Sequence, residues 1–271
     1  MDFIELIKYI FLGTIQGLTE AIPVSSSGHL MIFKNLIDLD VDFDTLAIVT
    51  NFGSLIAIIL VFWKDIIKLF GNFFKYLFKK DESAKADYKY CWLVVLGCIP
   101  AGIAGLIVSK LDLLEKIDDN VKIVGISLIV TSILLFLIRN IKGSRDDKDI
   151  TIKNALVIGL FQIIGLLPGI SRSGSTIIGG MNQDLKRDTA FKYSFMLYIP
   201  MSIAAMALEV TDILDKNVDT VTWIYYAVSA FMALIFTYIM TKWFRRVVNR
   251  GKLIYFSAYC FIVGLLVLIF L

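Results

Sequence analysis

The run Gln16-Gly-Leu-Thr-Glu20-Ala-Ile-Pro23-Val-Ser25-Ser26-Ser27-Gly28-His29 breaks the apolar segment Phe3–Phe33 near its middle. A second run, Gln162-Ile-Ile-Gly-Leu-Leu-Pro168-Gly169-Ile-Ser171-Arg172-Ser173-Gly174-Ser175-Thr176, breaks Ala155–Met181 in the same way. In each run, Pro or Gly ends one half-helix, and Ser and Gly supply cap residues for the next. Each half is too short to cross a hydrocarbon core, which needs about 20 helical residues. Such a segment is either two short spans or a hairpin that enters and leaves on one side.

The composition around these breaks is typical of a membrane protein. Of the 271 residues, 58% are hydrophobic and 19% are charged, and the mean hydropathy is +0.77. Soluble domains are about 45–50% apolar and about 25% charged. All four prolines lie inside apolar runs, where neighbouring helices of a membrane bundle compensate for the lost hydrogen bonds. The net charge of +3 does not indicate nucleic-acid binding, and the three cysteines have no metal-ligand spacing.

Six further runs are long and apolar enough to cross the membrane as helices. They are Leu46–Trp63, Cys91–Ser109, Val121–Arg139, Tyr193–Glu209, Val221–Thr241 and Leu253–Leu271. Lys64–Lys89 holds seven lysines and Lys242–Lys252 holds five basic residues, so both loops are predicted to be cytoplasmic. The acidic loops Asp38–Asp44 and Glu209–Asp219 are predicted to face outward. Trp63–Lys80 is either an amphipathic helix on the cytoplasmic surface or a helix running out of the membrane.

Counting crossings from these loops predicts two re-entrant hairpins. Phe3–Phe33 enters from outside and Ala155–Met181 from the cytoplasm, with the N-terminus and C-terminus both external. The N-terminus has no signal-peptide pattern, so we expect it to be retained.

An internal repeat agrees with this prediction. A shift of 146 residues aligns Gly13 with Gly159, Gln16 with Gln162, Ser25 with Ser171, Ser27 with Ser173, and Gly28 with Gly174. An odd number of spans in each half inverts the second copy. The predicted fold is therefore an all-α polytopic membrane protein with one domain, residues 1–271. It contains an inverted repeat (about 1–140 and 150–271), about six transmembrane helices and two re-entrant helical hairpins. Small residues from Gly105 through Gly125 could pack against a second copy in a homodimer.

The broken segments also carry the residues from which we expect a site. Helix N-termini with free N–H groups favour anions, phosphate above all. Glu20 and Arg172 lie deep in the membrane, where an ion costs about 2.5–3.5 kcal/mol on insertion scales. Glu20 and His29, the only histidine, flank three serines, which gives a hydroxyl nucleophile, a base and a carboxylate on one loop. Arg172 offers bidentate hydrogen bonds to a phosphate. These loops could cleave a phosphate-bearing ligand, or bind and move an anion without cleaving it.

The motifs Gln16–Glu20, Pro23–His29 and Pro168–Thr176 resemble those of the bacitracin-resistance type of undecaprenyl-diphosphatase, over essentially the whole chain. The resemblance implies a cell-membrane hydrolase that converts undecaprenyl diphosphate, a polyprenyl diphosphate lipid, to undecaprenyl phosphate and inorganic phosphate. That reaction recycles the lipid carrier for peptidoglycan and cell-wall synthesis. The implied catalytic residues are Glu20, Ser26, His29 and Arg172. The resemblance implies that Ser171, Ser173 and Thr176 contact the phosphate. The two loops add Gln16, Ser25, Ser27, Gly28 and Gly174 to the predicted substrate-binding residues.

The resemblance also implies a divalent cation, Mg²⁺ or Ca²⁺, held near Glu20. Gln16 stands where the family has Glu or Gln, and an amide cannot act as an anionic metal ligand. Three agents remain open for the attack on phosphorus: Ser26, His29 or a water. The acid-phosphatase type of lipid phosphatase is excluded because its mechanism uses two histidines, whereas His29 is the only histidine of this chain. The alternative function is a transporter or flippase for polyprenyl phosphate or another anion, built on the same two loops.

Overall fold

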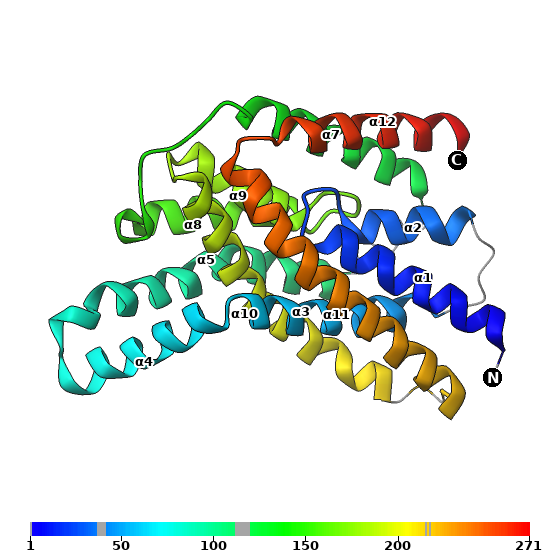
Figure 1. Cartoon of the computed structure of the whole chain (residues 1–271), viewed down its shortest axis with the longest axis horizontal. Helices are drawn as coiled ribbons and strands as arrows, with labels where there is room; N and C mark the ends of the chain where they lie inside the picture. The colour runs from blue at the N-terminus through cyan, green and yellow to red at the C-terminus, as the bar shows by residue number, and fades with distance from the viewer. Residues whose placement is uncertain (1, 37–41, 112–119, 215, 217) are drawn as a thin grey trace.

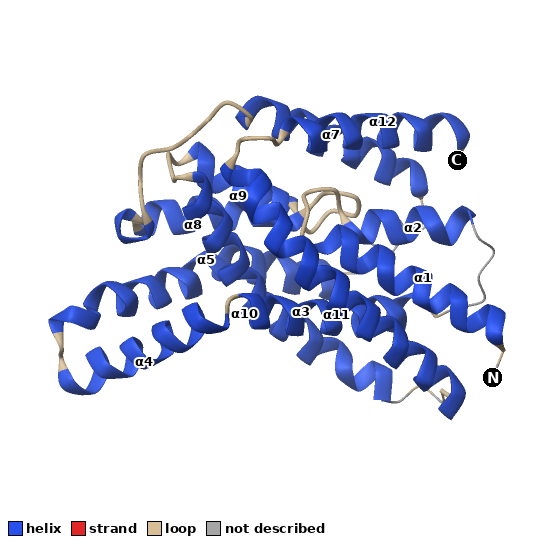
Figure 2. Cartoon of the chain, viewed as in Figure 1, coloured by secondary structure: helices blue, strands red, loops and turns tan. Residues whose placement is uncertain are grey.

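The computed structural model describes residues 2–36, 42–111, 120–214, 216 and 218–271, and the regular elements within these ranges are helices (Figures 1 and 2). The α-helices are α1 Phe3–Glu20, α2 Ser26–Leu36, α3 Phe43–Val61, α4 Trp63–Lys79, α5 Lys85–Lys110, α7 Val121–Ile138, α8 Ile152–Ile164, α9 Arg172–Asn182, α10 Arg187–Leu214, α11 Thr220–Asn249 and α12 Ile254–Phe270. Two short 3₁₀ turns, η1 Glu82–Ala84 and η2 Asp147–Asp149, complete the set. Parts of three predicted features lie outside the described residues: 38–41 of the first acidic loop, 112–119 of the Gly105–Gly125 stretch, and 215 and 217 of the second acidic loop.

The expectation of an all-α polytopic membrane protein is confirmed. Five helical segments are long and apolar enough to cross a bilayer: α3, η1 with α5, α7, α10 and α11. The sixth expected span is α12, an apolar helix of 17 residues. At a rise of 1.5 Å per residue it measures about 26 Å, slightly less than a hydrocarbon core of about 30 Å.

Each broken segment forms a pair of helices joined by a turn. α1, at 18 residues, is as long as α7 and longer than expected for a half-helix, although it is not among the helices apolar enough to cross a bilayer. α1 and α2 are joined at Ala21–Ser25, and α8 and α9 are joined at Gly165–Ser171. α2 and α9 have 11 residues each and α8 has 13, so none of these three helices could span a bilayer alone. The breaks predicted from Pro23 and Pro168 are therefore real ends of helices. Proline has no backbone N–H to donate and its ring clashes with the preceding helical turn, so a helix tends to end before it.

The two pairs pack in the same way against long helices of the opposite half. α1 lies on α11 and α8 lies on α5. A Cβ atom added at Gly13 would lie 2.2 Å from the Ser229 carbonyl oxygen of α11. A Cβ atom added at Gly159 would lie 2.4 Å from the Gly97 carbonyl oxygen of α5. Because Gly13 and Gly159 align in the repeat, both halves use a glycine for the same close helix crossing.

We expect Gly13→Ala and Gly159→Ala each to lower thermal stability in detergent. An added methyl group would meet backbone oxygen, so the helices must separate, and overpacking of this kind costs about 1–3 kcal/mol. The midpoint should fall by about 2–4 °C per kcal/mol. Gly105→Ala in α5 is the matched control, since nothing lies within 4 Å of its added Cβ. Equal midpoints for Gly105→Ala and Gly159→Ala would contradict this account of the crossing.

The α4–α5 pair projects from the bundle on the side away from both termini (Figure 1). Phe73 of α4 stacks on Tyr88 of α5, with ring centres 5.0 Å apart, and lies 6.2 Å from Trp92. Asn72 donates a hydrogen bond of 2.6 Å to the Asp87 carboxylate. The segment Trp63–Lys80 is therefore a helix, α4, that follows α3 after one residue and packs antiparallel to the start of α5.

The basic connections meet at the end of the molecule that carries α4. Lys192 of α10 forms ion pairs with Asp65 of α4 (2.8 Å) and Asp147 of η2 (3.0 Å). The Arg145 backbone N–H donates to the Asp184 carbonyl oxygen at 3.0 Å, which joins the α7–α8 and α9–α10 connections. The N-terminus and C-terminus both lie at the opposite end, on either side of α1 and α2 (Figure 1). The start of α4 and the α7–α8 and α9–α10 connections therefore lie at one end of the bundle.

Candidate functional site

The turns of the two helix pairs contact each other in the interior of the bundle. A Cβ atom added at Gly28 would lie 3.1 Å from the Gly169 Cα, and one added at Gly174 would lie 3.1 Å from the Pro23 Cβ. The shift of 146 residues that aligns Gly28 with Gly174 also aligns Pro23 with Gly169. The two contacts are therefore equivalent: each half places the start of its second short helix against the break of the other half.

Both second helices begin with the same capping arrangement. The Ser25 hydroxyl accepts the Gly28 N–H at 3.2 Å, and the Ser171 hydroxyl accepts the Gly174 N–H at 3.1 Å. In each half the hydroxyl of the serine two residues further on, Ser27 or Ser173, lies 3.3 Å from the capping hydroxyl. Capping satisfies only part of the first helical turn, so further N–H groups of α2 and α9 remain without intrahelical acceptors. These are the groups that a phosphate would use.

Four of the predicted residues meet in one buried polar cluster. Glu20, only 8% exposed, accepts a hydrogen bond of 2.9 Å from the Gln16 side-chain amide. The Ser26 hydroxyl donates to the same carboxylate oxygen, Oε2. The other oxygen, Oε1, lies 3.2 Å from Nη2 of Arg172, which comes from the second half of the chain. The structure thus joins the carboxylate, the hydroxyl and the guanidinium that the sequence predicts for the site.

Arg172 is held by two residues that the sequence does not mark, Tyr198 and Ser202, and Tyr198 is in turn bonded to a third, Asn51. Its guanidinium carbon lies 4.5 Å from the ring centre of Tyr198, a cation–π contact. Nη1 lies 3.5 Å from the Ser202 hydroxyl, and the Tyr198 hydroxyl donates to Asn51 Oδ1 at 3.1 Å. Tyr198 and Ser202 flank Pro200 inside α10. Pro200 is the only nearby feature of the sequence that could have drawn attention to Tyr198 and Ser202.

His29 lies apart from this cluster. Its Nδ1 is 2.8 Å from the Ser25 carbonyl oxygen, and its Nε2 is 2.7 Å from the Tyr259 hydroxyl of α12. Since a carbonyl oxygen only accepts, Nδ1 carries the proton of the neutral ring and Nε2 accepts from Tyr259. The ring also stacks on Tyr259, with centres 5.7 Å apart. His29 follows Ser26 by one helical turn on α2, yet its ring nitrogens bond Ser25 and Tyr259 of α12.

Two further polar residues of the second helix pair differ in their hydrogen bonding. Thr176 donates to the Arg172 carbonyl oxygen at 3.1 Å and also bonds the Ser194 hydroxyl, so it ties α9 to α10. Gln162, the repeat partner of Gln16, is 1% exposed, and its two amide atoms have no hydrogen-bond partner among the described residues. The second half therefore lacks the counterpart of the Gln16–Glu20 pair, because residue 166 is leucine.

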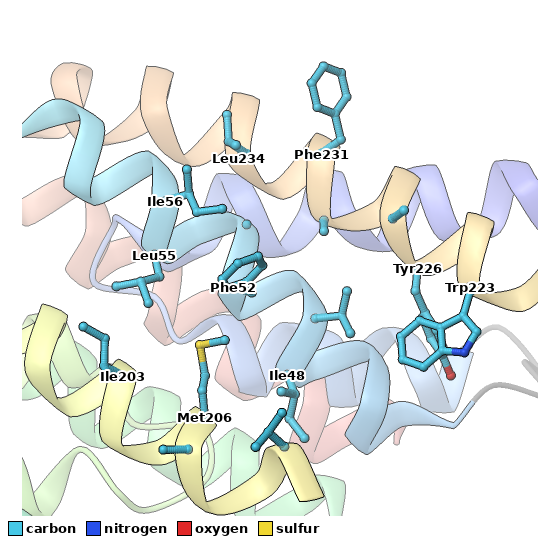
Figure 3. A pocket seen from close by; sticks show the side chains of 16 residues that line it. Ile48, Phe52, Leu55, Ile56, Ile203, Met206, Trp223, Tyr226, Phe231 and Leu234 are labelled. Atoms are coloured by element: carbon cyan, nitrogen blue, oxygen red, sulfur yellow. The ribbon is translucent and has the colours of Figure 1, made fainter. Parts of the chain in front are cut away.

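An apolar cavity of about 840 Å³ lies between α3, α10 and α11 (Figure 3). Its walls include Phe52 and Ile203, which follow Asn51 and Ser202 directly in sequence. Figure 3 shows Met206 of α10 facing the cavity from one side, with Ile48 and Leu55 of α3 nearby. The residues that hold Arg172 thus adjoin a cavity suited to a hydrocarbon chain.

The fold and the cluster define the class: a multi-pass helical membrane protein with a polar cluster enclosed between two helix pairs. The chain belongs to the family described as Bacitracin resistance protein BacA, whose family model matches residues 9–266. Undecaprenyl-diphosphatase 3 of Bacillus anthracis is 43% identical over 100% of this chain and 99% of its own length. Undecaprenyl-diphosphatase 1 of Bacillus licheniformis is 41% identical over all of both chains. The Undecaprenyl-diphosphatase of Oceanobacillus iheyensis is 39% identical, covering 100% of this chain and 98% of that one.

Proposed function

We propose that this chain hydrolyses undecaprenyl diphosphate to undecaprenyl phosphate and inorganic phosphate. The cluster of Glu20, Ser26 and Arg172 carries the proposal, because it pairs a hydroxyl with a carboxylate and sets a guanidinium beside them. The enzyme class expected from the sequence is confirmed by the names of the relatives, which lend no support to the transporter. The reaction would return the lipid carrier to peptidoglycan synthesis at the cell membrane.

The two helix pairs are proposed to be re-entrant hairpins of an inverted repeat. The equivalent glycine crossings at Gly13 and Gly159 support this arrangement, as do the exchanged contacts of Gly28 and Gly174. Repeats that meet in broken helices near the midplane are a known way to build a buried ligand site. The basic connections around α4 support a cytoplasmic location for that end, with the N-terminus and C-terminus external. The unit is then one domain. Gly105, with nothing within 4 Å of an added Cβ, is open to a second copy in a homodimer, whereas Gly125 packs against Gly264 of α12.

The diphosphate group is proposed to bind between Arg172 and the N-termini of α2 and α9. Arg172 offers two N–H groups in one plane, the geometry that a phosphate accepts. The predicted substrate-binding residues shape this cradle: Gln16, Ser25, Ser27, Gly28, Ser171, Ser173, Gly174 and Thr176. Ser25 and Ser171 fix the first turns of the two helices, which aims their free N–H groups. The prenyl tail would leave along the apolar cavity beside Ser202 or into the lipid.

Ser26 is the proposed nucleophile. Its hydroxyl already donates to Glu20, so Glu20 can take the proton as the oxygen bonds to the terminal phosphorus. The bond between that phosphorus and the bridging oxygen breaks, and undecaprenyl phosphate leaves. Water then cleaves the phosphoserine to release inorganic phosphate and restore Ser26. A water held by Ser26 and Glu20 would achieve the same net hydrolysis in one step.

His29 is proposed to transfer a proton after Tyr259 moves away from Nε2. It lies one turn from Ser26, and its Nδ1–H bond to Ser25 keeps the ring in the tautomer that leaves Nε2 basic.

The donor set fits a divalent cation shared with the substrate. Glu20 is the one carboxylate of the cluster, and it accepts three hydrogen bonds while a carboxylate offers about four lone-pair sites. Mg²⁺ is often held by one or two carboxylates together with substrate phosphates. We propose that Mg²⁺, or Ca²⁺, binds Glu20 and the diphosphate. When bound, the cation would neutralise charge on the phosphate oxygens.

The direct test is phosphate release from undecaprenyl or farnesyl diphosphate by the purified protein in detergent with Mg²⁺. Stoichiometric release of phosphate and prenyl monophosphate is the expected result. A folded protein that binds the lipid but releases no phosphate would refute the hydrolase and favour the transporter.

Removal of divalent cations should abolish turnover without unfolding the protein. We expect a chelator to reduce phosphate release to background and added Mg²⁺ to restore it, with the thermal midpoint unchanged. The cation is expected to bind with the diphosphate rather than in a protein cage, so the apo fold does not depend on it. Full activity in the chelator would exclude the proposed cation.

A further inference from the structure

A second cavity, of about 550 Å³, lies between the α1–α2 turn and the α11–α12 connection. It is called here the basic pocket, defined by Ile22, Val24, Arg246, Arg250, Lys252 and Tyr259. Ile22 and Val24 belong to the turn that separates Glu20 from Ser26. The basic pocket therefore reaches the back of the turn that carries the proposed active site. The cluster residues Glu20, Ser26 and Arg172 are not among those that line it.

The wall of the basic pocket carries three cations. Among the described residues, no carboxylate lies within ion-pair distance of Arg246, Arg250 or Lys252. Arg245, their neighbour outside the pocket, is by contrast paired with Asp188 at 2.7 Å. Unpaired cations around a cavity indicate an anionic ligand.

The rest of the wall is apolar and aromatic. Trp243 and Phe256 line it together with Val247, and Lys252 lies 5.9 Å from the ring centre of Tyr255. A free anion would leave this surface unused, whereas a hydrocarbon tail would cover it. A phosphate monoester carries about −1.5 to −2 charges near pH 7. Three cations suit such a head better than the single charge of a phosphodiester lipid.

The basic pocket is joined to the proposed active site by α12. Tyr259 lines the pocket, and its hydroxyl is 2.7 Å from Nε2 of His29. The next residue, Cys260, contacts the Pro23 carbonyl oxygen at 3.6 Å. A ligand against Tyr259 would therefore act on the residue that occupies the basic nitrogen of His29.

We propose that the basic pocket binds a phosphate monoester carried on an aliphatic tail, the class to which the prenyl phosphate product belongs. The choice of a prenyl tail rests on the proposed function, and the phosphate head rests on the three cations. A bound lipid phosphate holds Tyr259 on His29 and so slows turnover. Tyr259 is a positioning residue in this scheme, and the product inhibits from a site apart from the catalytic cluster.

Trp243 allows the basic pocket to be observed by itself. Replacing Trp63, Trp92 and Trp223 with Phe leaves Trp243 as the only tryptophan. Titration with farnesyl phosphate in detergent, without divalent cations, should give a saturable change in fluorescence. The same change should persist with Arg172→Ala, because Arg172 does not line the pocket. Farnesol and inorganic phosphate at equal concentration should give none, since each lacks half of the ligand.

Variants decide whether the cations hold the ligand. Arg246→Gln with Arg250→Gln should weaken farnesyl phosphate binding at least tenfold, while Lys242→Gln, outside the pocket, should leave it unchanged. Phosphatidic acid tests the other source of the same chemistry. Binding as tight as that of farnesyl phosphate supports a site for any lipid phosphate monoester, and weaker binding supports a site for the prenyl product. Equal binding of inorganic phosphate, or an unchanged titration in the double variant, would overturn the proposal.

Kinetics test the link to His29. Farnesyl phosphate should lower kcat for farnesyl diphosphate in the wild type. In the double variant that effect should disappear while the uninhibited kcat stays within twofold. Inhibition that only raises KM, equally in both proteins, would overturn the link. If the wild type releases no phosphate at all, the proposed function fails. The Trp243 titration would still show whether the basic pocket binds a lipid phosphate monoester.

Discussion

Arg172→Ala should reduce phosphate release by on the order of 10³-fold or more, the range seen when an arginine that stabilises phosphoryl transfer is lost. Arg172 is the one guanidinium in the cluster, and its position is set by the Tyr198 ring and the Ser202 hydroxyl. Without it, the cluster keeps no positively charged side chain to stabilise the charge that gathers on the phosphate oxygens. Initial rates over a range of substrate concentrations would show the loss in kcat/KM.

Two companion variants separate this chemistry from folding. Arg172→Ala leaves Glu20 buried without its cation, and breaking a buried pair costs about 3–5 kcal/mol. Arg172→Ala combined with Glu20→Gln removes both charges and should recover much of the thermal midpoint, but none of the activity. Arg172→Lys keeps a charge but loses the planar pair of donors, so it should retain only partial activity. Turnover within tenfold of wild type in Arg172→Ala would remove Arg172 from the site.

Ser26→Ala should lower kcat by on the order of 10⁴-fold. Loss of an acid–base group costs about 10²–10⁴, and loss of a serine nucleophile about 10⁶. The Ser26 hydroxyl is bonded to Glu20, whereas that of Ser27 is 3.3 Å from Ser25. Ser27→Ala is thus the matched comparison, and we expect it to retain at least 100 times more activity than Ser26→Ala.

The covalent step has its own readout. Rapid quenching of a reaction with substrate labelled on the terminal phosphate should trap label on the protein if Ser26 attacks. Label that reaches Ser26→Ala protein as efficiently as wild type would rule out Ser26 as nucleophile. Absence of label from active wild type would instead assign the attack to water held by Ser26 and Glu20.

Local sequence was sufficient to predict the class of the protein and the position of its breaks. Apolar runs of membrane length can be recognised without a structure, because the bilayer imposes the same constraint on every span. Pro23 and Pro168 end helices through their own backbone chemistry, and α1 and α8 do end near them. Glu20 and Arg172 stood out because an ion in a membrane segment is costly unless it is paired. In the structure the two side chains form an ion pair with each other.

The close contacts around the site were decided by the tertiary structure. Tyr198 and Ser202 of α10 contact Arg172, and Asn51 of α3 bonds Tyr198. No sequence motif marks these three residues, because their role depends on which side chains the packing of the helices brings next to them. His29 was expected beside Ser26 because the two are close in sequence, yet its nitrogens bond Ser25 and Tyr259, which is 230 residues away. Sequence spacing fixes which residues share a helix face, but a side chain is oriented by the partner that packing brings to it, and that partner came from α12.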